Sequence, residues 1–255
     1  MEQNVVDQPL IEQTVVEQTV VEQTIVEQTV VEQLVNDNNK LLQYLLQNKI
    51  YNPSEMNELF MLIYENCIWG NDRSPDYSGS SGLGSHILYN VDYISFLKKF
   101  IKDNNILVVC DLGCGTFLSG PSIYGDIEII YNGYDIYKPL IDINNLNSTQ
   151  YNTRFFVLDF YNEMEQIPYS DLIIIKDVFS YWTNECITKL LDYIITNKKC
   201  KHILITNCCY QNLDNLDVQL GYFRPLTAQM RPLKDFGAIP IFKYRTKEVS
   251  LISLI

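Results

Sequence analysis

After residue 103 the chain alternates short apolar runs with stretches of helical periodicity. The apolar runs lie at 106–111, 129–135, 154–158, 171–175 and 202–206. Helical stretches separate several of them, most clearly 183–197. Nearly continuous apolar strands that alternate with helices are typical of a parallel sheet covered on both faces. The pattern therefore predicts an α/β domain over 103–255, and the apolar positions from about 238 onward predict a terminal hairpin.

Residues 37–102 predict a helical flank that contains one loop. Helices are expected over 39–46, 54–68 and 87–102, and Ser54 behind Pro53 has the character of a helix N-cap. The stretch 70–85 is rich in Gly, Ser and Asp, which predicts a loop. This loop is either a plain linker or a segment that closes over a ligand, because glycine lets backbone amides approach bound polar groups.

The N-terminal tail repeats a five-residue unit over 10–34, as LIEQT, VVEQT, VVEQT, IVEQT and VVEQL. With a period of five, successive valine pairs fall on different faces of a helix and on alternate faces of a strand. We therefore expect residues 1–36 to be a low-complexity, weakly helical tail without chemistry. The alternative is a helix through which copies of the chain associate, although the repeat lacks heptads.

Charge and composition indicate which classes of binding partner and which cellular compartment to expect. The 255 residues carry a formal net charge of -12. No basic patch offsets this charge, so nucleic acid is not an expected partner. A membrane partner is not expected either, because no run of about 18 apolar residues occurs. The first residues also lack the basic start of a signal peptide, so we expect a cytoplasmic protein.

The cysteines predict free thiols rather than a metal centre. There are seven of them without a secretory context, which favours a reducing compartment. Cys110 with Cys114, and Cys208 with Cys209, do not match the usual zinc spacings. Only two histidines, His86 and His202, are available to complete a site, so no metal is expected.

A glycine turn follows the first apolar run, in the sequence VVCDLGCGT at 108–116. By itself a G-x-G pair is a weak signal. At the carboxyl end of the first strand of a parallel sheet, however, it marks the expected ligand crevice. Gly113 and Gly115 would let the backbone approach a ligand, and Asp111 is placed to meet a cationic ammonium group.

Acidic residues end the next strands as well. Asp135 comes twenty residues after Gly115, where two carboxylate oxygens can accept both hydroxyls of a ribose. Asp159 ends the third strand, where a carboxylate can accept from an adenine amino group. The charged pair Lys176–Asp177 follows four apolar residues and must lie at a strand end rather than in the core.

Taken together, these residues resemble the class I S-adenosylmethionine (SAM)-dependent methyltransferases. The order D-x-G-x-G, an acid after strand two and an acid after strand three carries the resemblance. It is closest to a subgroup of bacterial and large-virus members, some of them encoded near glycan genes. Its further motifs are Trp69, the SGLGS run 81–85, GYD at 133–135, IKDV at 175–178, ITN at 205–207 and GYFRPL at 221–226.

The resemblance implies a Rossmann-like α/β fold and SAM as the cofactor. Its cofactor residues would be Asp111, Gly113, Gly115, Asp135, Asp159, Ser81 and Gly82. It also implies methyl transfer by in-line displacement, with Asp177 as the base or acceptor orienter, Lys176 as its partner and His86 as a further candidate. The acceptor side would be lined by Asn207, Arg224 and Trp182, of which Arg224 suits an anionic or polyhydroxyl acceptor.

Departures from the subgroup concern the acceptor. Thr116 stands where Asp often follows G-C-G, Trp182 stands where His is frequent, and 227–232 lacks the usual L-D-L. We expect a methyltransferase acting on a small polar acceptor, a hydroxyl of a sugar or glycan precursor. The alternatives are small-molecule or protein methylation, and a catalytically inactive SAM-binding scaffold that assembles through its repeat tail.

Overall fold

The computed structural model describes residues 29–30, 33–34, 36–47, 56–70, 80–148, 152–209 and 215–254. The repeat up to residue 28, the helix start expected at Ser54 and most of the predicted glycine-rich loop (71–79) lie outside the described residues. No helix in the described ranges is long and apolar enough to cross a membrane.

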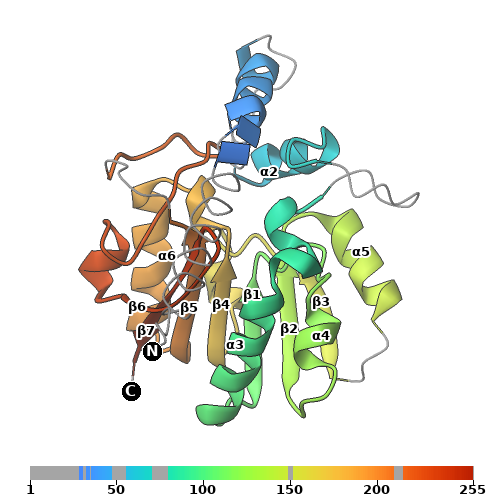
Figure 1. The fold of residues 1–255 in the computed structure, drawn as a ribbon, viewed down its shortest axis with the longest axis vertical. Coiled ribbons are helices and arrows are strands. Elements are labelled where there is room, and N and C mark those ends of the chain that lie inside the picture. Colours follow the sequence, from blue (N-terminus) through green and yellow to red (C-terminus); the bar gives the residue numbers. More distant parts are fainter. Residues whose placement is uncertain are drawn as a thin grey trace, which may run out of the picture.

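A seven-stranded sheet forms the centre of the molecule, in the order β3-β2-β1-β4-β5-β7-β6 (Figure 1). The strands are β1 (Val108–Leu112), β2 (Ile130–Asp135), β3 (Thr153–Val157), β4 (Ser170–Lys176), β5 (Cys200–Cys208), β6 (Ile239–Tyr244) and β7 (Lys247–Ser253). The first five run parallel, and β7 pairs antiparallel with both β5 and β6. All five predicted parallel strands and the predicted terminal hairpin are present.

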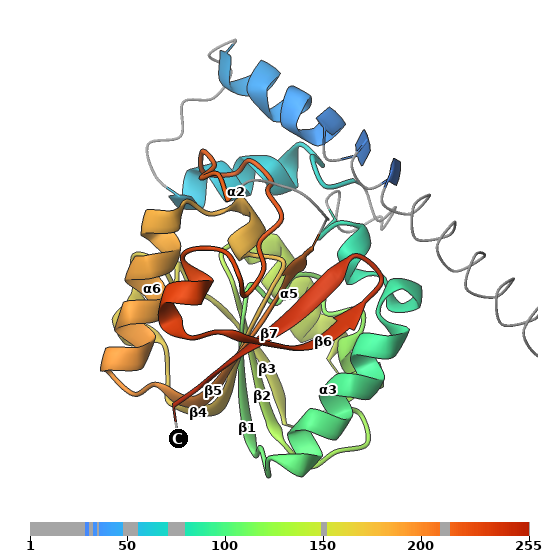
Figure 2. The ribbon, with the colours of Figure 1, turned by 60° about the vertical axis from the view of Figure 1, so that its left-hand side comes forward.

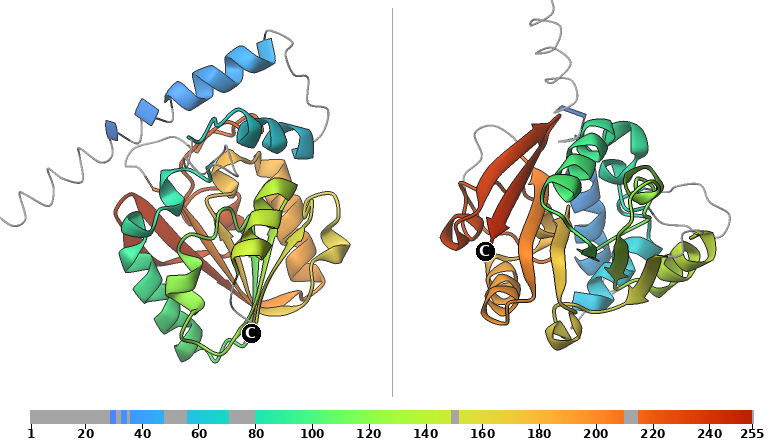
Figure 3. Two further views of the ribbon diagram at one scale, coloured as in Figure 1. Left: turned by 90° about the vertical axis from the view of Figure 1, so that its right-hand side faces the viewer. Right: turned by 90° about the horizontal axis from the view of Figure 1, so that it is seen from below.

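Helices cover both faces of this sheet (Figures 1 and 3). They are α3 (Val91–Asp103), α4 (Gly120–Tyr124), α5 (Lys138–Asn147) and α6 (Asn184–Thr196), and a further helix, α2 (Met56–Glu65), lies above the ends of the strands. Alternating strand residues serve the two faces: Val109 and Leu172 pack with α3 and α4. Ile173 and Ile175 pack with α6 on the other face. The α/β architecture expected from the sequence is therefore confirmed.

One predicted helix begins later than its pattern suggested. The stretch 87–102 forms a short 3-10 turn, Ile87–Tyr89, before α3 begins at Val91. The interruption is at Asn90, whose side-chain amide donates to the carbonyls of Gly84 (2.7 Å) and His86 (3.0 Å). Asparagine side chains that bond to nearby backbone compete with helix hydrogen bonds, so the helix starts after this residue.

The carboxyl edge of the parallel strands is covered by a helical roof (Figure 2). This roof consists of α2 and the helical residues 36–47, which contain the amphipathic helix predicted at 39–46. Leu42 and Leu59 are buried and approach Gly221 on the segment before β6. The roof is thus fixed by apolar packing directly above the strand ends.

The antiparallel strand β7 brings a residue to the same edge from the end of the sequence. Because β7 runs against β5, its first residue, Lys247, pairs in register with Cys208, the last residue of β5. Lys247 therefore lies where the parallel strands end.

Candidate functional site

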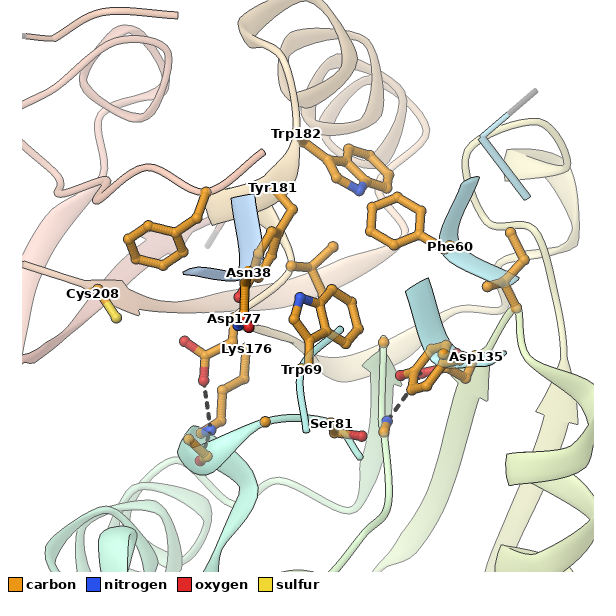
Figure 4. A pocket seen from close by; sticks show the side chains of 18 of the residues that line it. Asn38, Phe60, Trp69, Ser81, Asp135, Lys176, Asp177, Tyr181, Trp182 and Cys208 are labelled. Atoms are coloured by element: carbon orange, nitrogen blue, oxygen red, sulfur yellow. Dashed lines mark hydrogen bonds and ion pairs between the residues drawn. The ribbon is translucent and has the colours of Figure 1, made fainter. Parts of the chain in front are cut away.

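A cavity of about 260 Å³ lies between the carboxyl ends of the strands and the helical roof. The turn after β1, the last residue of β2 and the end of β4 form its floor (Figure 4). The roof contributes Phe60 and Tyr64 from α2, and Leu34 and Asn38 from the residues before it. The site is therefore at the edge of the sheet where open parallel folds bind ligands.

The glycine turn brings its backbone close to the 80–85 loop. Gly113 and Cys114 both donate their N–H groups to the Tyr134 carbonyl, at 2.8 and 3.0 Å. Gly115 has φ +56°, and a Cβ there would lie 2.5 Å from the hydroxyl oxygen of Ser81. That hydroxyl accepts from the Thr116 N–H at 2.9 Å. Only glycine permits this approach, so the loop and the turn form one wall of the cavity.

Asp135 is a buried carboxylate that faces the cavity. It is only 4% exposed and accepts from the N–H groups of Gly115 (3.1 Å) and Tyr137 (3.2 Å). Tyr64 donates to it at 3.4 Å from the roof. Burial raises its pKa above the ordinary value, against these hydrogen bonds. Tyr64 is the longest of these three contacts and comes from a side chain, so a ligand hydroxyl can displace it or bind beside it.

Asp159 lines the same cavity, two residues after the end of β3. Its carboxylate accepts from the backbone N–H groups of Tyr161 (3.3 Å) and Asn162 (3.1 Å) and from the Asn162 amide (2.8 Å). These contacts fix its orientation within a turn of its own.

Asp111 faces a second, smaller cavity of about 90 Å³ beneath the glycine turn. Asn90, Ser119 and Lys176 also line this space, which adjoins the larger cavity at Gly113 and Gly115. Tyr131 donates to Asp111 at 2.7 Å. Burial raises the pKa of Asp111 to about 6, although Tyr131 and the charge of Lys176 act to lower it. No cation is hydrogen-bonded to this acid within the described ranges, so it is suited to a cationic ligand group.

At the end of β4, one carboxylate lies between two ammonium groups. Lys176 donates to Asp177 at 2.9 Å and to the Gly84 carbonyl at 2.7 Å. Lys247, 5% exposed, donates to the other oxygen of Asp177. Asp177 has φ +62°, and its N–H donates to the Thr206 carbonyl at 2.7 Å. Lys176 and Asp177 are found at a strand end, as expected; the sequence pattern does not point to Lys247.

These charges decide what Asp177 can do. Burial would raise its pKa, but Lys176 and Lys247 outweigh burial and hold the pKa at about 2. Burial would lower the pKa of Lys247, and Asp177 holds it well above the ordinary value. A carboxylate with so low a pKa is a poor proton acceptor at neutral pH. The geometry therefore favours an orienting role for Asp177 over the role of base.

Aromatic side chains form the wall opposite the strand ends (Figure 4). The Trp69 ring lies 4.9 Å from the ring of Tyr181 and 5.2 Å from that of Tyr64. Trp182 stacks on Phe160 with ring centroids 5.6 Å apart. Trp182, expected on the acceptor side, does line the cavity, whereas the sequence gives no sign of the aromatic residues of the roof.

Several solved structures that resemble this chain are methyltransferases. An O-methyltransferase family protein from Burkholderia thailandensis matches with a TM-score of 0.50 at 11% identity, over 64% of this chain and 55% of its own. The methyltransferase domain of bacterial CtHen1 matches with a TM-score of 0.49 at 12% identity, over 65% of this chain and 100% of its own. Magnesium protoporphyrin IX methyltransferase from Synechocystis, solved with bound SAH, gives 0.45 at 13% identity, over 64% and 83%.

The fold is that of a Rossmann-like methyltransferase. This confirms the expected fold class. No known protein family matches the sequence, and neither does any curated protein. In the described ranges, no group of three or more His, Cys, Asp or Glu side chains is arranged to hold a metal ion.

Three residues expected at the site do not line the larger cavity. His86 is exposed and accepts from the Leu88 N–H at 3.4 Å, as the cap of a short turn. Asn207 is 1% exposed and accepts from the Ser180 hydroxyl at 3.3 Å. Arg224 is buried, and its guanidinium donates to the Asn184 side chain (2.6 Å) and the Leu216 carbonyl (3.0 Å). Arg224 is thus used to fix loops, and the cations at the cavity are lysines.

Proposed function

We propose that this protein is a SAM-dependent methyltransferase that acts on a small acceptor. The observation that carries the proposal is the placement of Asp111, Asp135 and Asp159 around adjoining cavities at one edge of the sheet. A glycine turn passes between these acids, and the strand order is that of the methyltransferase fold. The solved methyltransferases support the fold, and the acids supply the chemistry that this cofactor requires.

The chain's residues fit the cofactor group by group. Asp135 would accept from the two ribose hydroxyls, because its carboxylate lies at the cavity and each of its oxygens can accept more than one hydrogen bond. Asp159 would accept from the adenine amino group. Asp111 would pair with the ammonium of the methionine portion in the smaller cavity. Gly115 lets the Ser81 side chain pack against the glycine turn at the cavity wall, because a Cβ there would lie 2.5 Å from the Ser81 hydroxyl oxygen.

SAM supplies a methyl group bonded to a positively charged sulfur. When the acceptor atom attacks the methyl carbon, the sulfur departs as a neutral thioether. The chain's contribution is then mainly to hold the acceptor in line. Trp69 and Tyr181 shape the acceptor side, and the roof of α2 shields it from water. Asp177, fixed by two lysines, orients the acceptor rather than taking its proton, and the proton of an attacking hydroxyl is released to solvent.

The acceptor we favour is a hydroxyl of a sugar or glycan precursor. The motif resemblance supports this choice, and so does the aromatic wall, because sugar rings stack on aromatic faces. The volume of about 260 Å³ favours a small acceptor over a protein side chain. A catalytically inactive scaffold that assembles through the repeat tail is the alternative outside enzymes.

The test is transfer of a labelled methyl group from SAM into panels of acceptors. Nucleotide sugars form the first panel, other small molecules the second and unfolded proteins the third. Labelled product in the sugar panel supports the proposal, and product only in the protein panel overturns the choice of acceptor. Binding of SAH without transfer in any panel favours the scaffold.

A further inference from the structure

The acceptor end of the cavity carries more positive than negative charge. Lys176 and Lys247 both line it, and both pair with the single carboxylate of Asp177. The cluster of these three residues, called here the lysine pair with Asp177, has a formal charge of +1. Burial in a low-dielectric site makes an uncompensated charge expensive unless a counter-charge arrives.

The nearby acidic side chains in the described structure do not neutralise this positive charge. Glu248, next to Lys247 in sequence, points to the other side of β7, where it accepts from the Ala228 N–H (2.8 Å) and pairs with Lys243 (3.3 Å). Asp111 shares the lining of the smaller cavity with Lys176, whose charge lowers its pKa, but in the proposed function Asp111 is taken up by the cofactor's ammonium. A buried ion cluster that only stabilised the fold would be expected to balance its charges.

The lysines also retain hydrogen-bonding capacity toward the cavity. An ammonium has three N–H donors. Lys176 directs two of them to Asp177 and Gly84, and Lys247 directs one to Asp177. A Cβ at Gly84 would lie 3.2 Å from the Lys247 nitrogen, so this ammonium lies directly against the loop that borders the cavity. An anionic group entering the cavity can therefore accept from Lys247 without breaking the pair with Asp177.

The aromatic wall beside the lysines suits a flat or chair-shaped ring. Trp69 and Tyr181 lie beside the Lys176–Asp177 end of the cavity, with ring centroids 4.9 Å apart (Figure 4). An acceptor that stacks on these rings can place a substituent on the lysines. Anion and ring are thus recognised by neighbouring parts of one cavity.

We propose that the methyl acceptor is a ring compound carrying a carboxylate or phosphate, and that Lys247 is the residue that selects this anionic group. The proposal rests on the proposed function for the identity of the cavity as the acceptor site. It replaces Arg224, which the sequence suggested for an anionic acceptor, with a residue from the far end of the chain.

The test measures binding of matched probes to SAH-saturated protein by isothermal titration. The pairs are glucuronate against glucose, glucose 1-phosphate against glucose, and 4-hydroxybenzoate against 4-hydroxybenzamide. We expect the anionic member of at least one pair to bind about tenfold or more tightly than the neutral one. The pair that shows the preference distinguishes a sugar acid, a sugar phosphate and an aromatic acid.

Two variants with opposite expected effects separate recognition from folding. Lys247→Met removes the cation with similar volume and should abolish the preference while SAH affinity stays within about twofold of the native value. Asp177→Asn removes the competing carboxylate and should strengthen binding of the anionic probe. Loss of folding cannot produce both results.

Several outcomes overturn the proposal. These are equal binding within every pair, no binding of any anionic probe at about 10 mM, and a preference that survives Lys247→Met. If SAH itself does not bind, the proposed function fails first, and the same probes titrated without SAH still test whether Lys247 selects anions.

Discussion

Replacing Asp135 by Asn changes one charge at the centre of the proposed cofactor site. The native carboxylate accepts from Gly115, Tyr137 and Tyr64, and is 4% exposed. The asparagine has nearly the same shape but offers one acceptor oxygen and no charge. Its amide group must face either the Gly115 N–H or the Tyr137 N–H, so one donor meets another donor.

The magnitude follows from the type of hydrogen bond lost. A bond to a charged acceptor contributes about 1.5–3 kcal/mol and a neutral one about 0.5–1.5 kcal/mol. Exchanging two charged-acceptor bonds for one neutral bond should weaken SAH binding by about 1.5–5.5 kcal/mol, which is roughly tenfold or more. The unmatched donor should also lower the free energy of unfolding by about 1–3 kcal/mol.

Intrinsic fluorescence is a direct assay, because both tryptophans of the chain, Trp69 and Trp182, line the cavity. Titration with SAH gives the dissociation constant, and a urea melt shows that the variant is folded. The matched control is Asp142→Asn on α5, whose exposed carboxylate pairs with Lys138; it should leave SAH affinity within about twofold. A folded Asp135→Asn variant that binds SAH as the native protein does would refute the reasoning.

Four further predictions follow from the same geometry. SAH affinity should weaken as the pH falls through about 6, because Asp111 has a pKa of about 6 and binds an ammonium only when ionised; Asp111→Asn should flatten a titration series from about pH 5 to 8. Gly115→Ala should lower stability in urea melts by more than Gly237→Ala: both have positive φ, worth about 1–2 kcal/mol, but only at Gly115 does the new Cβ meet Ser81, whereas at Gly237 it meets open space. Arg224→Met should lower the free energy of unfolding by about 2–3 kcal/mol by leaving acceptors unpaired, with no change in SAH affinity by titration, because Arg224 lies outside the cavity lining. Deleting residues 1–28 should leave SAH affinity within about twofold by titration, because the first described residue that lines the cavity is Leu34.

The sheet is predictable from the sequence because its signal is local. Each parallel strand is a short apolar run. Asp111 near the end of β1, Asp135 as the last residue of β2 and Asp177 directly after β4 interrupt these runs where the strands end. Hydrophobic burial on both faces of a parallel sheet leaves few other arrangements for such a pattern. For this reason the sequence alone places Asp135 and Lys176 at the carboxyl edge.

The site residues that the sequence does not reveal depend on contacts between distant parts of the chain. Lys247 reaches the site only because β7 runs antiparallel to β5, and the pattern of apolar residues does not predict the direction of a strand. Tyr64 reaches Asp135 through the packing of α2 across the strand ends, 71 residues away in sequence. The charge of Arg224 suggests an acceptor contact, but its partners Asn184 and Leu216 become visible only in three dimensions.

The boundary expected at residue 36 divides a region that the structure joins. Leu34 and Asn38 line one cavity, although the sequence pattern places the junction of the repeat and the helical flank between them. Whether the repeat has a further role in self-association stays a prediction, since residues up to 28 lie outside the described part of the chain.

The most direct test of the central claim is a crystal structure of the protein grown with SAH. The account predicts the ribose hydroxyls on Asp135, the adenine toward Asp159 and the ammonium on Asp111. SAH bound elsewhere, or bound in the cavity with its ribose away from Asp135, would contradict the account. So would crystals grown at saturating SAH in which the cavity holds no ligand.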